Sequence, residues 1–319
     1  MPTASTPVRI GTRASRLAQT QTRTVQAALA AALDRAHEPD AAAPLVLVTT
    51  TGDRIQDRRL LEVGGKALFT KELEAALLAG DVDCCVHSLK DVPAESPPGL
   101  ALAAHPPRED ARDALLSPGG LELDALPERA VIGTASLRRG AQLRFRRPDL
   151  RIELLRGNVD TRLAKLEAGE FDAIVLAAAG LNRLGFADRP MVRLDPVGFP
   201  PAPGQGALAI QTREADVDAA WARALDHAPT RLLLAAERGA LEALEGSCRT
   251  AMGAHARRDG DRLILTVEAL TPDGTARFRR EGEMALADDA ARDLPAARGL
   301  GLQLGAAVRD EGGDRLELH

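Results

Sequence analysis

Arginine and lysine are concentrated between Arg129 and Lys165, although the chain as a whole is acidic. This segment holds ten basic residues and three acidic ones, a local charge of +7, so the rest of the 319-residue chain carries −12 to reach the total of −5. Planar guanidinium groups pair with carboxylates or phosphates through two parallel hydrogen bonds. A confined group of arginines in an acidic chain therefore predicts a bounded site for a small molecule with several negative charges.

Other kinds of chemistry find less support in the composition. Base stacking on nucleic acid needs exposed aromatic residues, and Phe145 is the only aromatic residue in the basic segment. The three cysteines form no Cys-x-x-Cys pair and no cluster with histidine, which argues against a metal site or a disulfide framework. Cys84 and Cys85 lie in an apolar run typical of a buried strand, whereas Cys248 lies in a loop-like stretch beside Arg249, a cation that would favour a thiolate.

The sequence also limits where the protein can act. Residues 1–7 are polar and lack the basic and apolar segments of a signal peptide, and no run of about 18 apolar residues occurs elsewhere. We expect a cytoplasmic protein that does not bind membranes. Its length suits two or three domains of about 100 residues each.

Strand-length apolar runs alternate with segments of helical period over the first 200 residues, which predicts an α/β fold with parallel sheets. A proline-rich joint at 196–203 indicates a domain boundary or hinge. The expected strands are 8–10, 45–49, 83–88, 130–132, 151–155 and 173–177, and the expected helices are 17–36, 71–79, 159–168, one that begins near Ser136 and a helical turn through Arg183.

The pattern changes after Trp221. A helical segment at 230–244 precedes three strand-like segments that are separated by turns containing Asp-Gly, and a final helix is expected at 287–309. This order predicts a small α+β domain in which a helix covers one face of a three-stranded antiparallel sheet. The three strands are expected at 251–258, 262–270 and 276–284.

Basic side chains recur just after the predicted strands, where open α/β sheets bind ligands. Hydroxyl groups and free N–H groups at the starts of the following helices would add to the attraction for anions. We therefore expect two α/β lobes that face each other across a cationic cleft. The basic residues are Arg13, Lys90, Arg138, Arg139, Arg156 and Arg183, and the hydroxyls belong to Thr12, Ser15, Thr134 and Ser136.

One acidic residue stands among these cations. Asp91 follows the strand expected at 83–88 and directly follows Lys90. It could serve as a turn carboxylate or as a partner for Lys90, but it could also stabilise a cationic intermediate or transfer protons. His87 should point away from it and pack or hydrogen-bond locally.

Eight segments that span nearly the entire chain together resemble the porphobilinogen deaminase family, and they occur in the family's order. Each motif alone would be weak, whereas the set is highly specific. The segments are RASRLA at 13–18, VGGKALF at 63–69, VHSLKDVP at 86–93, GTASLRR at 133–139, LRGNV at 155–159, AGLNRLG at 179–185, PGQGA at 203–207 and LEGSC at 244–248.

The resemblance implies a transferase of tetrapyrrole and haem biosynthesis with three domains. Two α/β lobes similar to those of periplasmic binding proteins, at 1–106 with 201–226 and at 107–200, would surround the cationic cleft, and 229–319 would form the α+β domain. Such enzymes join four porphobilinogen molecules head to tail, with loss of ammonia, and then hydrolyse the product to 1-hydroxymethylbilane. A monomer with porphobilinogen as its small-molecule substrate, and with no nucleic-acid partner and no metal, is expected.

The resemblance also assigns the site residues. Asp91 would be the catalytic acid/base beside the pyrrole nitrogens, and Cys248 would hold a dipyrromethane cofactor through a thioether. Gly64 to Phe69 would form a mobile covering loop. The residues expected to bind the acetate and propionate groups of cofactor and substrate are Arg13, Ser15, Lys90, Thr134, Ser136, Arg138, Arg139, Arg156, Asn158, Arg162, Arg183 and Gln205.

The chain departs from the family pattern around the expected attachment residue. Ser247 replaces a commoner glycine, and RTAM at 249–252 replaces the usual QVPI, but the sulfur of Cys248 is retained. Two other classes remain open: a non-catalytic carboxylate-binding protein on the same two-lobed fold, and an arginine-rich nucleic-acid module. The mass of the intact protein separates the three, because only the deaminase should carry a covalent adduct.

Overall fold

The computed structural model describes residues 6–51, 69–244 and 250–316, and these form two compact units. Unit 1 comprises residues 6–51, 69–108 and 207–231. Unit 2 comprises residues 109–206, 232–244 and 250–316, and it contains two separate sheets. The expected division into domains at 1–106 with 201–226, 107–200 and 229–319 stays a prediction.

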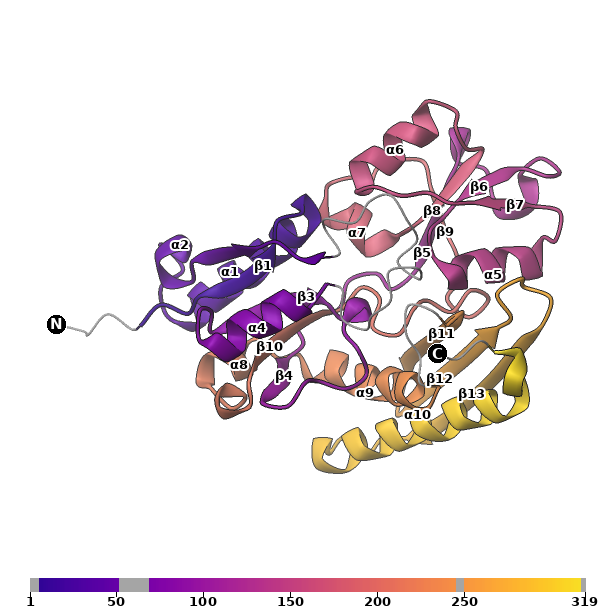
Figure 1. The fold of residues 1–319 in the computed structure, drawn as a ribbon. Coiled ribbons are helices and arrows are strands. Elements are labelled where there is room, and N and C mark those ends of the chain that lie inside the picture. Colours follow the sequence, from indigo (N-terminus) through magenta and orange to yellow (C-terminus); the bar gives the residue numbers. More distant parts are fainter. Residues whose placement is uncertain (1–5, 52–68, 245–249, 317–319) are drawn as a thin grey trace. The chain divides into compact units, whose positions relative to one another are not determined.

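Unit 1 is built on a five-stranded mixed sheet with strand order β2-β1-β3-β10-β4 (Figure 1). The predicted parallel pairing is confirmed for β1 with β2 and β3, but β4 and β10 were not predicted, and β10 runs antiparallel to both β3 and β4. Because the chain passes through unit 2 before β10, this strand can enter from the opposite direction without a helical crossover. The strands are β1 (Ile10–Arg13), β2 (Leu45–Val48), β3 (Cys84–Ser88), β4 (Leu100–Ala104) and β10 (Leu208–Arg213).

Helices cover both faces of this sheet. Leu29 of α1 packs in one apolar cluster with Cys84, whereas Leu73 of α4 packs in another with Cys85. Successive strand residues point to opposite faces, so the two cysteines enter different cores, and their predicted burial is confirmed. The helices of unit 1 are α1 (Arg16–Ala32), α2 (Pro39–Ala42), α4 (Lys71–Ala79) and α8 (Ala220–Ala224), with 3₁₀ turns at Leu89–Asp91 and Glu214–Asp216.

The first sheet of unit 2 has the order β7-β6-β8-β5-β9. As in unit 1, three parallel strands are followed by an antiparallel strand, here β5 beside β8. Leu115 and Ile132 pack on one face of the sheet, and Leu116 and Ile174 on the other. The elements are β5 (Asp113–Leu116), β6 (Val131–Gly133), α5 (Leu137–Arg146), β7 (Arg151–Glu153), α6 (Val159–Glu167), β8 (Ala173–Ala177), α7 (Ala178–Arg183) and β9 (Val192–Arg193), with 3₁₀ turns at Pro118–Gly120 and Leu123–Ala125.

The predicted C-terminal antiparallel sheet is confirmed, with the strand order β11-β12-β13. Helices α9 and α10 pack against it (Figure 1). The two helices approach each other so closely at Gly301 that a Cβ atom there would lie 2.1 Å from the carbonyl oxygen of Ala236. The elements are α9 (Ala228–Ala243), β11 (Met252–Asp259), β12 (Arg262–Leu270), β13 (Arg277–Ala285) and α10 (Ala290–Gly312), followed by a 3₁₀ turn at Gly313–Arg315.

The β12–β13 turn packs directly on α5. Gly274 in this turn has φ +76°, and a Cβ there would lie 2.6 Å from the carbonyl oxygen of Ala141. The guanidinium of Arg277 lies 4.6 Å from the centre of the Phe145 ring. Helix α5, which starts at the basic motif, is therefore fixed from both sheets of unit 2.

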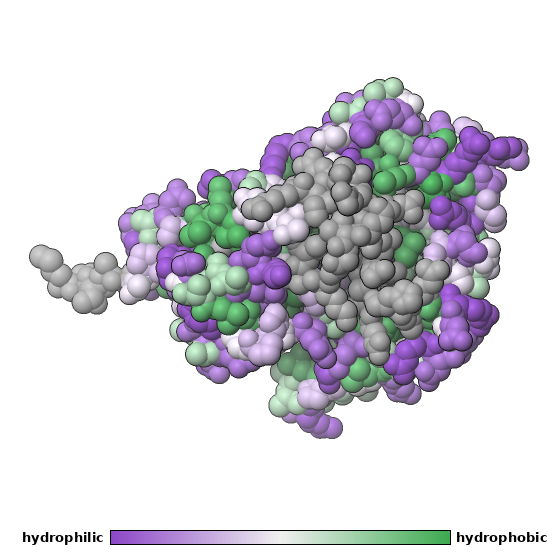
Figure 2. All heavy atoms as spheres, viewed as in Figure 1, coloured by the Kyte–Doolittle hydropathy of each residue, from purple (hydrophilic) through white to green (hydrophobic). Residues whose placement is uncertain are grey.

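Polar and apolar side chains are mixed on the visible surface of each unit (Figure 2). The large hydrophobic residues that are exposed come from separate elements, such as Leu47 of β2 and Leu78 of α4. Within the described ranges, no helix is both long and apolar enough to cross a bilayer.

Candidate functional site

The site residues of unit 1 come from the ends of β1 and β3. Arg13 is the last residue of β1 rather than the residue after it, and its guanidinium lies 4.2 Å from the centre of the Phe69 ring. Ser15 caps α1, because its hydroxyl accepts a hydrogen bond from the N–H of Ala18. Helix α1 therefore starts at Arg16, three residues after Arg13.

Asp91 lies in a narrow pocket that also contains Arg13 and Phe69. The chain reaches this pocket because β3 ends at Ser88 and the 3₁₀ turn Leu89–Asp91 redirects it. The pocket thus combines a carboxylate, a guanidinium and an aromatic ring, and all three are sequence-predicted site residues or belong to the predicted covering loop. Of that loop, Gly64 and the residues up to 68 lie outside the described ranges.

His87 and Gln21 also line this pocket. Nε2 of His87 lies 3.0 Å from Oε1 of Gln211, which confirms the expected local hydrogen bond. Burial, with a smaller contribution from the Arg13 charge, lowers the pKa of His87 to about 4 against the raising effect of the Gln211 hydrogen bond. Gln21, which the sequence reasoning missed, donates from Nε2 to the Ser88 hydroxyl at 3.0 Å. Gln21 could have been found in the sequence, because it is a polar residue on the face of α1 that is buried.

In unit 2 the hydroxyl and amide residues of the motif lie at helix starts. Ser136 caps α5 by accepting from the N–H of Arg139, and Thr134 Oγ1 accepts from the N–H of Ser136. Asn158 caps α6 by accepting from the N–H of Thr161 at 2.8 Å. These side chains fix the helix ends, and their contact with a ligand stays a prediction.

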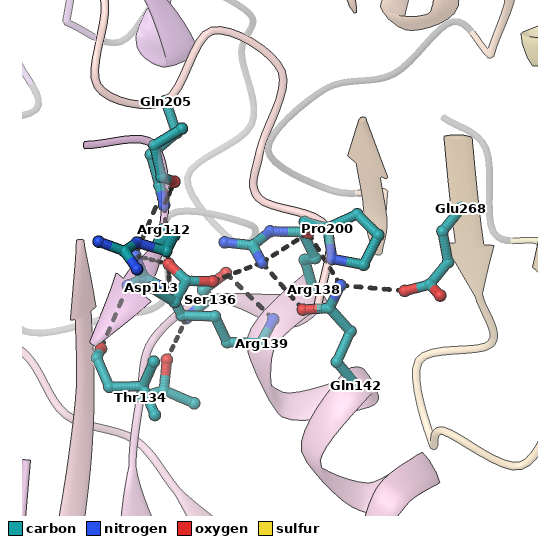
Figure 3. Close-up of polar contacts among 12 residues, drawn as sticks. Arg112, Asp113, Thr134, Ser136, Arg138, Arg139, Gln142, Pro200, Gln205 and Glu268 are labelled. Carbon is teal, nitrogen blue, oxygen red and sulfur yellow. Dashed lines mark hydrogen bonds and ion pairs between the residues drawn. The ribbon is translucent and has the colours of Figure 1, made fainter. Parts of the chain in front are cut away.

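Arg138 and Arg139 point to the same carboxylate, that of Asp113 (Figure 3). Nη1 of Arg138 lies 2.7 Å from Oδ2 of Asp113, and Nη2 of Arg139 lies 2.8 Å from Oδ1. Gln205 donates from Nε2 to Oδ1 at 2.8 Å. Sequence reasoning missed Asp113, which begins the unpredicted strand β5.

The same network extends to the C-terminal sheet. Oε1 of Gln142 accepts from Arg138, and its Nε2 donates to Oε1 of Glu268 on β12 at 3.0 Å. Burial raises the pKa of Glu268, while Gln142 and nearby arginines oppose this rise. Arg138 and Gln205 are 4% and 1% exposed, so both side chains lie inside this network. Their direct contact with a ligand stays a prediction.

Three arginines of unit 2 form a cluster with excess positive charge: Arg139, Arg156 and Arg162. Burial, together with the charges of Arg139 and Arg156, lowers the pKa of Arg162 to about 10. Nε of Arg156 is buried and has no hydrogen-bond partner among the described residues. Such a cluster is stabilised when an anion binds, so it fits a small ligand that carries several carboxylates.

The remaining predicted residues fall into three situations. Arg183 at the end of α7 donates to the carbonyl oxygen of Gly206 at 2.8 Å, and burial lowers its pKa despite the opposing charge of Glu109. Lys90 lies half-buried beside Asp91 in the 3₁₀ turn. Cys248 lies outside the described residues. In the described ranges, no group of three or more His, Cys, Asp or Glu residues could hold a metal ion.

Comparison with protein families gives two adjacent matches. Residues 8–220 match the model of the dipyrromethane cofactor binding domain of porphobilinogen deaminase, and residues 232–309 match the model of the C-terminal domain of the same enzyme. The second match begins in α9 and ends in α10. The motifs of both units therefore fall within one family pattern.

Curated relatives match over nearly the whole chain. The porphobilinogen deaminase of Phenylobacterium zucineum is 59% identical, with 98% of each chain covered. That of Caulobacter sp. strain K31 is 60% identical, again with 98% of each chain covered. That of Nitrobacter hamburgensis is 50% identical over 91% of this chain and 92% of its own.

Solved structures with partial similarity include periplasmic domains and binding proteins. The periplasmic BvgS VFT2 domain of Bordetella pertussis is 15% identical, covers 68% of this chain and 85% of its own, and has a TM-score of 0.38. The periplasmic sulfonate-binding protein SsuA of Methylobacillus flagellatus is 13% identical, covers 76% of this chain and 68% of its own, and has the same TM-score of 0.38. At these TM-scores the similarity carries no argument about function.

Proposed function

The chain belongs to the porphobilinogen deaminase family, and on this premise we propose that it acts as a hydroxymethylbilane synthase. It is a transferase of tetrapyrrole biosynthesis that carries a dipyrromethane cofactor. In the proposed reaction four porphobilinogen molecules are joined head to tail, one ammonia is lost at each addition, and hydrolysis releases linear 1-hydroxymethylbilane. The alternative of a non-catalytic carboxylate-binding protein is not favoured.

The observation that carries the proposal is the pocket that holds Asp91 together with Arg13 and Phe69. Ammonia loss from porphobilinogen leaves a positive charge on the pyrrole and its methylene group. A guanidinium cannot stabilise that charge, whereas the Asp91 carboxylate can offset it and can exchange a proton with the pyrrole nitrogen. Arg13 is suited instead to hold a carboxylate of the substrate.

The arginine cluster of unit 2 supports the cofactor assignment. When bound, the dipyrromethane supplies the pyrrole carbon to which the first porphobilinogen is joined. Arg139, Arg156 and Arg162 would bind its acetate and propionate groups, because each pyrrole ring carries two carboxylates and the cluster has excess positive charge. We propose Cys248 as the attachment residue, with a thioether to the cofactor. We further propose a monomer in the cytoplasm.

The proposed function is tested with the purified wild-type protein. Its intact mass should exceed the sequence mass by that of a dipyrromethane, and incubation with porphobilinogen should release ammonia and 1-hydroxymethylbilane in a ratio of four to one. An unmodified protein that binds porphobilinogen without ammonia release would overturn the proposal in favour of a carboxylate-binding protein. Denatured enzyme provides the control for spontaneous condensation of the substrate.

A further inference from the structure

The carboxylate of Asp113 is buried at the centre of the hydrogen-bond network in unit 2, and both of its oxygens accept hydrogen bonds. Its side chain is 1% exposed. Oδ2 accepts a hydrogen bond from Nη1 of Arg138 at 2.7 Å, and Oδ1 accepts from Nε of Arg139 at 2.9 Å and from Nε2 of Gln205 at 2.8 Å (Figure 3). Burial alone would raise the pKa of Asp113, but the two arginines outweigh burial and hold it well below its ordinary value. Asp113 is therefore a carboxylate that stays charged.

The position of the two arginines explains why this carboxylate is needed. Arg138 and Arg139 lie in the first turn of α5, which contains no acidic residue. The amino end of a helix carries partial positive charge, so two consecutive buried cations there repel both the helix end and each other. Asp113 supplies the missing negative charge from β5, a different element of the same unit.

The hydrogen bonds also fix the orientation of Arg139. Its Nε and Nη2 face Asp113, Nη1 donates to the carbonyl oxygen of Val175 at 3.2 Å, and Nη2 also donates to Oε1 of Gln205 at 3.3 Å. A guanidinium held from several directions has few other rotamers. Its position relative to Arg156 and Arg162 is then set before any ligand arrives.

The cluster keeps a net positive charge that attracts anions. Asp113 offers one negative charge to Arg138 and Arg139, so one positive charge of the pair remains. That charge is felt at Arg162, whose pKa falls to about 10 through burial and through the nearby charges of Arg139 and Arg156. One carboxylate therefore orients the arginines without neutralising the site.

We propose that Asp113 is a positioning residue, which holds Arg139 in the orientation that the carboxylates of the growing pyrrole chain require. This inference rests on the proposed function and adds to it a residue that does not itself touch the substrate. Because positioning acts on carboxylate binding rather than on the chemistry at Asp91, its loss should raise KM far more than it lowers kcat.

The test compares Asp113→Asn with wild-type enzyme after both have been loaded with cofactor and checked by intact mass. The amide keeps the shape of the side chain, but it loses the charge and can no longer accept hydrogen bonds at both ends. We expect KM for porphobilinogen to rise about tenfold or more, with kcat per loaded enzyme within about threefold of wild type. An unchanged KM in the folded, loaded variant overturns the proposal.

Asp83→Asn is the matched control. Asp83 also accepts hydrogen bonds from an arginine at both oxygens, those of Arg9 at 2.9 and 3.0 Å, and Arg213 approaches it to 3.6 Å, but it precedes β3 in unit 1 and touches none of the proposed binding residues. This variant should lower thermal stability and leave KM within about twofold of wild type. An equal rise of KM in both variants would show a general loss of structure and overturn the positioning role.

Asp113→Glu keeps the experiment decisive if Asp113→Asn does not fold. The longer side chain retains the charge that α5 requires but displaces the contact with Arg139 by one methylene group. KM should rise severalfold in the folded variant, and a wild-type KM in this variant contradicts positioning. Wild-type turnover of porphobilinogen is measured first, so failure of the proposed function is seen separately from failure of this inference.

Discussion

At the scale of single residues, the proposed mechanism separates binding from chemistry by charge. In it the cations hold carboxylates, and the chemistry falls to Asp91, the acid that lies in a pocket with Arg13 and Phe69. The same division explains why the His87 side chain that lines the pocket is neutral, since a second cation there would oppose a positive charge on the substrate. Two variants test these roles independently.

Asp91→Asn should retain the cofactor and bind porphobilinogen, but turn over about 10² to 10³ times more slowly, because the amide keeps the shape and loses the charge that offsets the cation. Asp91→Glu should retain more activity than Asn, since it keeps the charge and misplaces it by one methylene group. The measurement is single-turnover ammonia release from loaded enzyme. Release at the wild-type rate by a fully loaded Asn variant would remove Asp91 from the mechanism.

His87 predicts a specific dependence of stability on pH. Its pKa is about 4 in the folded protein and about 6.5 in the unfolded chain. Between these values only the unfolded chain binds the proton, so the free energy of unfolding falls as the pH falls from 6.5 to 4. The stability from a neutral His87 is therefore present above pH 6.5, and roughly 2 kcal/mol of it is lost between pH 7 and pH 5.

The check on His87 is denaturant unfolding of wild type and His87→Gln at pH 7 and pH 5. The variant cannot titrate at this position, so it should lose less stability than wild type over the same interval. Other groups titrate equally in both proteins and cancel in the difference. Identical pH dependence in the two proteins would mean that His87 is not the group responsible.

At the scale of elements, helix starts were the most predictable part of the site. The start of α5 after Ser136 follows from a capping residue placed before a segment of helical period, and α6 starts in the same way after Asn158. Asp113 could not be predicted in this way. Its strand β5 has four residues, and its partners come from α5 and Gln205, which lie far away in the sequence.

Arg156 in the loop between β7 and α6 and Arg146 at the end of α5 are expected to differ in importance. Arg156→Ala should weaken the binding of cofactor or substrate by about 2 to 5 kcal/mol, because it removes a desolvated partner of a carboxylate. Arg146→Ala should have almost no effect, since Arg146 pairs with Asp124 at the surface and both side chains are more than half exposed. Cofactor occupancy by mass and KM for porphobilinogen are the readouts, and equal losses in the two variants would contradict the assignment.

At the scale of the whole molecule, the two α/β sheets follow one plan. Three parallel strands stand beside an antiparallel strand in both β2-β1-β3-β10-β4 and β7-β6-β8-β5-β9. The parallel strands were predictable because each is linked to a helix of clear period. The antiparallel strands were not, because β10 returns to unit 1 only after the chain has passed through 109–206, and local sequence does not encode that return.

Attachment of the cofactor depends on which cysteine can supply a thiolate. Cys84 and Cys85 are buried, and burial raises the pKa of both thiols, so neither can supply a thiolate to an incoming pyrrole. Cys248→Ala should therefore give a folded protein with the plain sequence mass and no turnover of porphobilinogen. Cys84→Ala should keep both the adduct and the activity, with some loss of stability from the core. Peptide mapping of the wild-type adduct decides the matter, and an adduct on Cys84 or Cys85 would require a different attachment chemistry from the one proposed.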